Sequence, residues 1–499
     1  MSFNLIRNAR MFFTTNVDVN TGVVKTDGFT ATNTKEIQVL DGLSFSQATG
    51  SETVTINEAG TAPIRGQRSF NTSLEPVELS FSTYIRPFFQ EGATSSTGYD
   101  ADDVVDAEED VLWNAFAAGY VDGSAELIGG ASAAWTKTAG VVGPPTVEPY
   151  STLTFGNSGK NQMQKFGVII TLDASSYIID NCVLDQASID FGLDAIATIA
   201  WTARGSTLRS VDLSASAGSA GVVTFSGNYL TGPSPAVSVT RTGVTVSAAT
   251  DVFTFTAHGL RKGMQVTVTS STATGLSNGI YYVIEVLTAD TFKLSDTLNG
   301  TTVAITADGA CNVAFNSDST ADVAKAKVTT APFLANKLSV IEITEGIGAT
   351  GTAYTLALTG GNITFSNNVT YLTPANLGTV NKPFTYFTGT RAVSGSVNCY
   401  LRTGGNRSAK LLADMLVGSA TDVEPDFQIK LSIGGADTAT TNRVVLTLPA
   451  CVLTIPAINT EQVVSSTINF TAQGSSGSAF AIDQNNEATI KYYAANTTP

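Results

Sequence analysis

The chain contains a single histidine, and this limits the catalytic mechanisms that it could use. A Ser-His-Asp or Cys-His mechanism would have to involve His258. That residue precedes Gly259 in a segment typical of a turn, so we interpret it as structural. The sequence also lacks a phosphate-binding GxxxxGKS or GxxxxGKT loop. We therefore assign its 45 glycines to turns.

Two groups of acidic residues could instead bind a cation or act as paired carboxylates. The first group comprises Asp100, Asp102, Asp103, Asp106, Glu108, Glu109 and Asp110. It lacks the loop glycine of an EF-hand calcium site, and acidic residues stabilise the positive end of a helix dipole. We predict a solvated helix start at this position. The alternative is a role at a subunit interface, or facing the lumen of an assembly if the chain forms one.

The second group, Asp185, Asp190 and Asp194, could supply the carboxylate pair of a glycosidase. An internal repeat, described below, has Thr454, Asn459 and Val463 at the matching positions. The shared fold therefore does not require these acids, and we predict no catalytic role for them.

The four cysteines, Cys182, Cys311, Cys399 and Cys451, form no CxxC pair and have no His-rich partner set for zinc. We interpret them as small hydrophobic residues of the core. The sequence thus predicts no catalytic residue, no metal and no cofactor, and we expect a protein that is not an enzyme.

The composition is typical of an all-β protein with a large core. Hydrophobic residues make up 43% of the 499 residues and charged residues only 14%. Val, Ile, Thr, Phe and Tyr recur in short runs that are broken by Gly, Asn and Pro, as in proteins built from many short strands. The length is sufficient for about three domains.

The net charge of −15 argues against nucleic-acid binding through a basic patch, because an acidic surface repels phosphate. The same charge suits a surface along which DNA slides without sticking. Residues 1–13 lack the long apolar region of a secretory signal, and no stretch reaches the roughly 18 apolar residues of a membrane span. We expect assembly in a cytoplasm and no contact with a membrane.

An internal repeat relates the two ends of the chain. Asn181–Leu184 is echoed by Ala450–Leu453, and Thr198–Ser206 is echoed by Thr467–Ser475. Both matches occur at one offset of 269 residues, which indicates descent from a duplicated unit. Upstream, ELSFSTYIR ending at Arg86 matches SGSVNCYLR ending at Arg402.

A helix is predicted after each of these upstream strands. In the first copy, residues 102–117 place their apolar side chains on one helical face, namely Val105, Leu112, Trp113 and Phe116. In the second copy the helix is predicted from Ser408, its N-cap, to near Gly418, with Leu411, Leu412, Met415 and Leu416 as apolar residues.

The rest of the chain fills three predicted regions. The first copy has 47 extra residues, which we place in loops at 88–99 and 119–149. Residues 214–236 are rich in Gly, Ser and Pro and predict a linker. Residues 237–315 predict a small immunoglobulin-like β-domain, with strands at 252–256, 264–269, 280–286, 291–294 and 302–306.

Several stretches resemble the tail tube proteins of long-tailed bacteriophages. NARMFFTTN at 8–16 and IQVLDGLSFSQ at 37–47 look like the start of such a protein. RSFN at 68–71 followed by FSTYIRP at 81–87 is the most specific part. The inserted segment, with AHGL at 257–260 and DTFKL at 290–294, resembles a small β-module of phage virion proteins.

The resemblance implies a β-sandwich or half-barrel with one flanking helix for each tube domain, and an all-β fold class with a tandem duplication and a small inserted β-domain. The predicted domains are a first tube domain at 1–213, a linker, an inserted domain at 237–315 and a second tube domain at 316–499. Family members form hexameric rings that share one closed β-barrel, the conduit for DNA ejection.

Because this chain has two tube domains, we expect trimeric, pseudo-hexameric rings in the virion tail. The resemblance implies as partners other copies of the chain, the tape measure protein, the tail tip or baseplate, terminator proteins, a sheath if the tail is contractile, and DNA in transient passage. Tyr84, Arg86, Tyr400 and Arg402 are predicted to lie at subunit interfaces or to be structural, for instance in a salt bridge within one domain. Asp185, Asp190 and Glu461 are predicted to face the lumen.

Three alternatives remain open from the sequence. One is another virion β-protein, such as a tail fibre or a capsid decoration protein. Another is a secreted carbohydrate-acting enzyme built of β-modules, which would have carboxylates and aromatic residues in a groove. The third is an array of adhesin-type binding modules.

Overall fold

The expectation of an all-β fold is confirmed by the computed structural model, which contains two α-helices among its described residues, α1 (Asp110–Ala117) and α2 (Ser408–Thr421). The structure describes residues 9–18, 20–25, 29, 33–58, 60–62, 64–90, 103–117, 135–140, 148–155, 163–172, 175–193, 195–211, 237–256, 258, 260, 265–288, 290–297, 300–317, 333–346, 351–421, 426–437, 441–459, 463–474 and 487–495.

The strands of the first copy pair in the order β2–β1–β11–β12–β13–β6–β3, and β14 pairs with the first half of β12. Buried and exposed residues alternate along β6 and β13, as expected for strands with one face on a core. The bounds are β1 (Ala9–Thr14), β2 (Thr34–Ile37), β3 (Ser44–Ser46), β6 (Val77–Tyr84), β11 (Phe166–Leu172), β12 (Ser175–Asp190), β13 (Thr198–Gly205) and β14 (Thr207–Val211).

The second copy repeats this order as β22–β21–β27–β28–β30–β26–β23, and β31 takes the place of β14 beside β28. A further short strand, β29, pairs with β30. The bounds are β21 (Val340–Glu345), β22 (Ala353–Thr355), β23 (Ala357–Ser366), β26 (Ala392–Tyr400), β27 (Asp426–Ile433), β28 (Arg443–Leu453), β29 (Ala457–Asn459), β30 (Ser465–Gln473) and β31 (Thr489–Tyr493).

The duplication is visible in the backbone register around the matched cysteines. Phe166 lies opposite Cys182, and a bulge follows before the next paired residue of β11. Phe427 lies opposite Cys451, and the same bulge follows, with the extra residue in β28 as it is in β12 of the first copy. A bulge adds one residue to one strand of a pair, so its recurrence at one position shows that both copies use one pairing scheme.

The final strand of the repeat does not keep the predicted offset. The sequence match aligns Trp201 with Phe470, but the pairing with the neighbouring strands makes Trp201 equivalent to Ile468. The displacement is two residues, and side chains alternate with a period of two. The inward and outward faces of β30 are therefore preserved, which is why the repeat could slip here without exposing its core.

The first predicted helix is shorter than the sequence suggested. Its beginning instead forms strand β8 (Val104–Ala107), which pairs with β7 (Pro87–Gln90) in a segment predicted as a loop. β-branched Val104 and Val105 favour a strand, and the helix starts only at Asp110. The predicted loop at 119–149 likewise contains β9 (Trp135–Thr138), which pairs with β10 (Tyr150–Thr154).

The second helix begins at the predicted Ser408 and extends three residues beyond Gly418. Each helix is tied to its copy at an equivalent place. Lys35 on β2 forms an ion pair with Asp110 at 2.6 Å, and Tyr354 on β22 donates a hydrogen bond to Asp414 at 2.5 Å. Different side chains thus hold the helix at the same position of the sheet.

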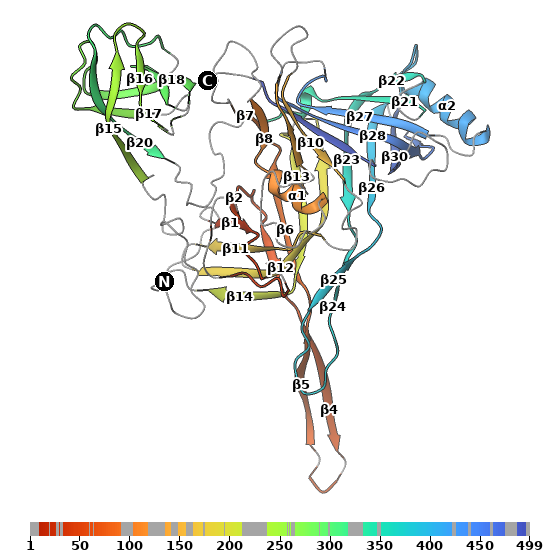
Figure 1. Cartoon of the computed structure of the whole chain (residues 1–499). Coiled ribbons are helices and arrows are strands. Elements are labelled where there is room, and N and C mark those ends of the chain that lie inside the picture. The colour runs from red at the N-terminus through yellow and green to blue at the C-terminus, as the bar shows by residue number, and fades with distance from the viewer. Residues whose placement is uncertain are drawn as a thin grey trace.

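Two hairpins project from the sheets at corresponding points of the repeat (Figure 1). The longer, β4 (Thr49–Glu58) with β5 (Ile64–Leu74), follows β3 and is called the arm here. The shorter, β24 (Val369–Leu372) with β25 (Thr385–Thr388), follows β23. The base of the arm is bonded to the segment that links β24 to β25, since Leu74 N–H donates to the Asn381 carbonyl at 2.8 Å.

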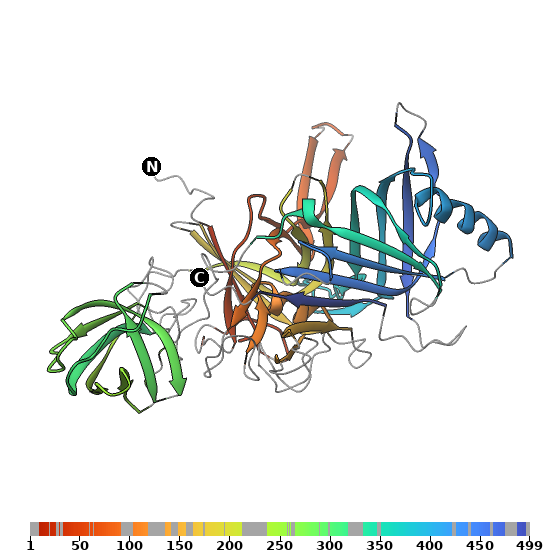
Figure 2. The ribbon, with the colours of Figure 1, turned by 90° about the horizontal axis from the view of Figure 1, so that it is seen from above.

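The inserted segment forms a closed six-stranded barrel with its own core (Figure 2). Its strands close on themselves and do not form the two separate sheets of an immunoglobulin-like domain. They are β15 (Val237–Ser247), β16 (Val252–Thr254), β17 (Gln265–Thr269), β18 (Gly279–Thr288), β19 (Thr291–Ser295) and β20 (Gly309–Ser317).

One predicted strand of this barrel is absent. Residues 302–306 are irregular, because Val303 N–H donates to Leu294 and Thr306 N–H to Thr274, two neighbours that form no common ladder. The predicted linker at 214–236 lies outside the described residues. Within the described part of the chain, no helix is long and apolar enough to span a membrane.

Candidate assembly interface

The two copies are joined by one continuous sheet. The second half of β12 lies between β13 of its own copy and β23 of the other copy. Five residue pairs connect β12 with β23, among them Ile189 with Ile363 and Ser188 with Thr364. We call this pairing the joint. Within the large sheet it makes β6, β13, β12, β23, β26 and β30 a continuous run of six strands across both copies, called the six-stranded sheet here.

One face of this six-stranded sheet is a hydrophobic core. A row of directly paired residues crosses all six strands and is buried throughout: Phe81, Trp201, Ala187, Phe365, Val393 and Ala472. Burial of apolar area at about 25 cal/mol per Å² stabilises such a contact. The two copies therefore share one core at the joint.

Phe365 is the aromatic residue that the second copy inserts into the core of the first. Its ring lies 5.7 Å from Phe155, stacked, and 5.7 Å from Trp113, edge to face. Trp113 in turn packs edge to face against Trp201 at 4.9 Å. Aromatic pairs of this geometry contribute about 0.5–1.5 kcal/mol beyond their burial, so helix α1 is fixed against both copies.

A second strand pairing supports the joint from the other side of the core. Strand β31 of the second copy pairs with β10 of the first over five residues. Beside it, the buried Arg443 forms an ion pair with Glu148 at 2.9 Å and lies over the ring of Tyr493 at 4.0 Å. The copies are thus held together at two separate edges.

Glu109 is buried in this same region, immediately before α1. Burial raises the pKa of its carboxyl to about 8. Burial and the nearby Glu109 carboxylate also raise the pKa of the Tyr492 hydroxyl. The predicted solvated helix start is therefore wrong for Asp103, Asp106, Glu108, Glu109 and Asp110, which are all buried.

The opposite face of the six-stranded sheet is polar and largely uncharged; we call it the hydroxyl face. The row next to the buried one reads Ser82, Ala200, Ser188, Thr364, Ser394 and Thr471. Side-chain hydrogen bonds run across it, including Ser188 Oγ with Thr364 Oγ1 at 3.1 Å and Ser396 Oγ to Asn362 Oδ1 at 2.7 Å. The bond between Ser188 and Thr364 crosses the joint and links the two copies on this face.

The predicted acids occupy different places relative to this face. Asp190 is exposed at the end of β12 and lies opposite Asn362 on the hydroxyl face. Asp185 pairs with Arg204 at 3.4 Å and accepts a hydrogen bond from Val369 N–H at 2.7 Å, so it also fixes the start of β24. Glu461 lies outside the described residues.

The four predicted interface residues lie at the ends of the equivalent strands β6 and β26, but the two pairs differ in environment. Tyr84 and Arg86 both contact Phe333 within the chain, with the Arg86 guanidinium 4.7 Å from the ring centre. Arg86 is buried and donates to Gln38 Oε1 at 2.5 Å. Tyr400 and Arg402 are exposed. Their backbone groups hold the Ser408 hydroxyl, which accepts from Arg402 N–H and donates to the Tyr400 carbonyl at 2.7 Å each.

The remaining candidate residues are structural in their contacts. His258 is buried, its Nδ1 accepts a hydrogen bond from Leu260 N–H at 2.9 Å, and burial lowers its pKa. The four cysteines are buried and none of them is in a disulfide, and burial raises the pKa of the Cys182 thiol. No group of three His, Cys, Asp or Glu side chains is arranged to hold a metal ion in the described part of the chain.

Comparison with known proteins gives one informative match. No protein family model matches the chain. Its sequence is similar to the tail tube protein pb6 of Escherichia phage T5, with 23% identity over 472 residues that cover 95% of this chain and 73% of that protein. The chain resembles a phage tail tube protein over nearly its whole length. This tail tube resemblance includes the second copy, which the sequence motifs reached mainly through the internal repeat.

Proposed function

We propose that this chain is the structural subunit of a phage tail tube and performs no covalent chemistry. The observation that carries the proposal is the six-stranded sheet, which has a shared core on one side and the hydroxyl face on the other. The similarity of the sequence to a tail tube protein over 95% of the chain supports the same role. The division into two tube domains, a linker and an inserted domain is part of this proposal.

Three chains form one ring in this proposal. The joint connects unlike strands, β12 of one copy and β23 of the other, and is therefore a heterologous contact. A heterologous contact closes into a ring when its repeated rotation completes a full turn, and otherwise gives an open filament. Six copies close the ring in the family, so three chains with two copies each suffice. The covalent link between copies raises the effective concentration of each neighbour and favours closure.

The hydroxyl face lines the lumen of this ring. Serine, threonine and asparagine side chains bind water and offer no fixed positive charge to hold a phosphate. The exposed Asp190 and the net charge of −15 add repulsion. DNA and the tape measure protein would therefore pass without being retained.

Rings stack into a tube through the arm, which projects beyond the large sheet (Figures 1 and 2). A lone two-stranded hairpin is marginal in water, and the arm exposes Val54 and Phe70 by 48% and 49%. A contact with the next ring would cover them. The tail tip or baseplate, terminator proteins and, in a contractile tail, a sheath complete the assembly, which takes place in the host cytoplasm and ends in the virion tail.

Electron microscopy of the purified chain, combined with native mass spectrometry of single rings, tests the proposal. We expect hollow tubes or stacked rings, and a ring mass of three chains with six similar lobes in projection. A product that stays monomeric under all conditions would contradict the tail tube role. A ring of six chains would contradict the trimer and leave the tube role standing.

A further inference from the structure

We infer that neighbouring chains pair β29 of one chain with β3 of the next, in the same register as the joint within a chain. The inference rests on the proposed ring and adds to it the two strands that meet and the residues that lie opposite each other. It follows from the duplication, because each half of the joint has a counterpart in the other copy.

Strand β29 is the counterpart of the last residues of β12. Ser188 pairs with Ala200, and Asp190 pairs with Thr198. In the second copy, Ala457 pairs with Thr467 and Asn459 with Ser465. These pairs agree with the register of the cysteine strands and with the two-residue displacement of β30. Pro456 stands at the position of Ala187 and separates β29 from β28, since proline cannot donate to a strand ladder.

Strand β3 is the counterpart of the part of β23 that enters the joint. Ser44 of β3 pairs with Ser80, four residues before Tyr84. Asn362 of β23 pairs with Ser396, four residues before Tyr400. Because the two tyrosines end equivalent strands, Ser44 corresponds to Asn362, and Phe45 to Ile363.

Both counterparts have an open edge. Within the described residues β29 pairs with β30 alone, and β3 pairs with β6 alone. The burial of one matched residue shows the effect: Ile189 in the joint is 1% exposed, whereas its counterpart Ile458 is 46% exposed. Open strand edges with exposed apolar side chains pair readily with another strand. The two edges differ, so they meet head to tail and not as a two-fold dimer.

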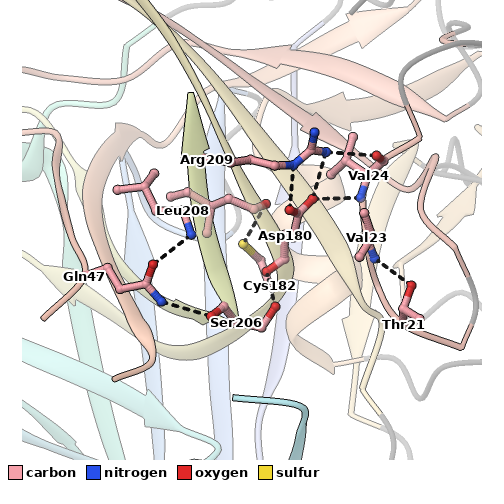
Figure 3. Close-up of polar contacts among 10 residues, drawn as sticks. Thr21, Val23, Val24, Gln47, Asp180, Cys182, Ser206, Leu208 and Arg209 are labelled. Atoms are coloured by element: carbon pink, nitrogen blue, oxygen red, sulfur yellow. Dashed lines mark hydrogen bonds and ion pairs between the residues drawn. The ribbon is translucent and has the colours of Figure 1, made fainter. Parts of the chain in front are cut away.

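The edge of β3 is fixed before any partner arrives. Gln47, the residue after β3, donates from its amide to the Ser206 carbonyl at 3.0 Å and accepts from Leu208 N–H at 3.0 Å (Figure 3). The strand that carries Leu208 is itself held by Arg209, which pairs with Asp180 at 2.7 Å. The Phe45 ring rests 5.5 Å from Tyr177. A preformed edge reduces the entropy lost on assembly.

Transfer of the joint register to these strands places Ile458 opposite Phe45 and Ala457 opposite Ser46 of the next chain. The pair of Ile458 and Phe45 would extend the shared core. A register shift of one residue would exchange the two faces, so the alternation of the strands specifies this pairing.

Disulfide trapping in the full-length chain tests the register. Directly opposite residues have Cβ atoms about 4.5–5.5 Å apart, so Ala457→Cys with Ser46→Cys should cross-link under mild oxidation into covalent dimers and trimers. The matched control is Ala457→Cys with Ser44→Cys, which displaces one thiol by two residues on the same face. We expect about tenfold more covalent trimer from the first pair, and none from the unmodified chain.

The outcomes separate the register from the ring. Rings of three chains in which the displaced pair cross-links as well as or better than the first pair would overturn the inference and leave the proposed function intact. A parent chain that forms no ring would overturn both.

A second variant avoids dependence on cysteine chemistry. Ile458→Asp changes a side chain that is already 46% exposed in the single chain, so we expect an unchanged Tm of the dissociated chain and loss of rings. Ile280→Asp, at a 56% exposed residue of the small barrel, should keep its rings. Normal rings from Ile458→Asp would overturn the inference.

Discussion

Trp113 donates a hydrogen bond from its indole Nε1 to the hydroxyl of Tyr492 at 2.8 Å, across 379 residues of sequence. Both side chains are buried, and they belong to the first helix and to the last strand of the second copy. The bond therefore links the two copies inside their shared core. A buried indole N–H that loses its acceptor costs about 1–3 kcal/mol.

We expect Tyr492→Phe to lower the free energy of unfolding by about 1–3 kcal/mol, because it leaves the Trp113 donor without an acceptor. Chemical denaturation of the dissociated chain measures the change. Tyr493→Phe, on the same strand and only half-buried, is the matched control and should change stability by less. Equal effects of the two variants would contradict the role assigned to this hydrogen bond.

The buried carboxyl of Glu109 should make the folding stability of the chain depend on pH. Burial raises the folded-state pKa to about 8 from the ordinary value of 4.5, so the folded chain keeps a proton that the unfolded chain releases. The corresponding stability is complete below pH 4.5 and is lost progressively as the pH rises to 8. Unlike the parent chain, Glu109→Gln should lose little stability over this range and should be roughly 3–5 kcal/mol more stable than it above pH 8.

Thermal unfolding at pH 5, 7 and 9 measures this difference. Glu52→Gln, at an exposed position of the arm, serves as the control and should follow the parent chain at every pH. A Glu109→Gln variant with the same pH dependence as the parent would show that the carboxyl ionises freely in the folded state.

Truncation of Phe365 should measure how much core packing at the joint contributes to stability. Its ring is fully buried between aromatic side chains of the first copy, so Phe365→Ala should cost about 3–5 kcal/mol and reduce ring formation. Phe387→Ala, at a ring that is 55% exposed, should cost less than about 1 kcal/mol. Denaturant titration of both variants provides the comparison. A small cost for Phe365→Ala would mean that the copies are held mainly by their strand pairing.

Removal of the arm should prevent rings from stacking into a tube. Ser51 and Asn71 lie directly opposite each other, so residues 52–70 can be replaced by Asn-Gly, a dipeptide that closes two-residue hairpins. We expect the shortened chain to form rings that do not stack, as judged by electron microscopy. Tubes of normal length would show that the arm is not the contact between rings.

We expect the inserted barrel to fold independently of the tube domains and to be dispensable for tube assembly. It has a separate hydrophobic cluster and shares no strand pairing with the large sheet among the described residues. Deletion of residues 237–317, with a short Gly/Ser linker across the gap, should leave tubes intact in electron micrographs. Failure of this variant to form tubes, while its isolated chain remains folded, would place the barrel in the tube wall.

The sequence by itself determined the features that depend on local pattern. Alternating residues before Tyr84 and Tyr400 predicted β6 and β26, and the N-cap pattern predicted a helix from Ser408. The matched cysteines revealed the duplication. Each of these signals lies within a short stretch of chain, where periodicity and turn chemistry dominate.

Only the tertiary structure decided how the two copies meet. Nothing in the local pattern pairs Ser188 with Thr364 or places Tyr492 against Trp113, because such contacts join segments that are far apart in sequence and are selected by shared burial. The same reason explains the errors. Asp106, Glu108, Glu109 and Asp110 were predicted to form a solvated helix start but are buried under β10 and β31. The two-residue slip of β30 keeps every side chain on its original face, so no change in the sequence pattern could reveal the slip.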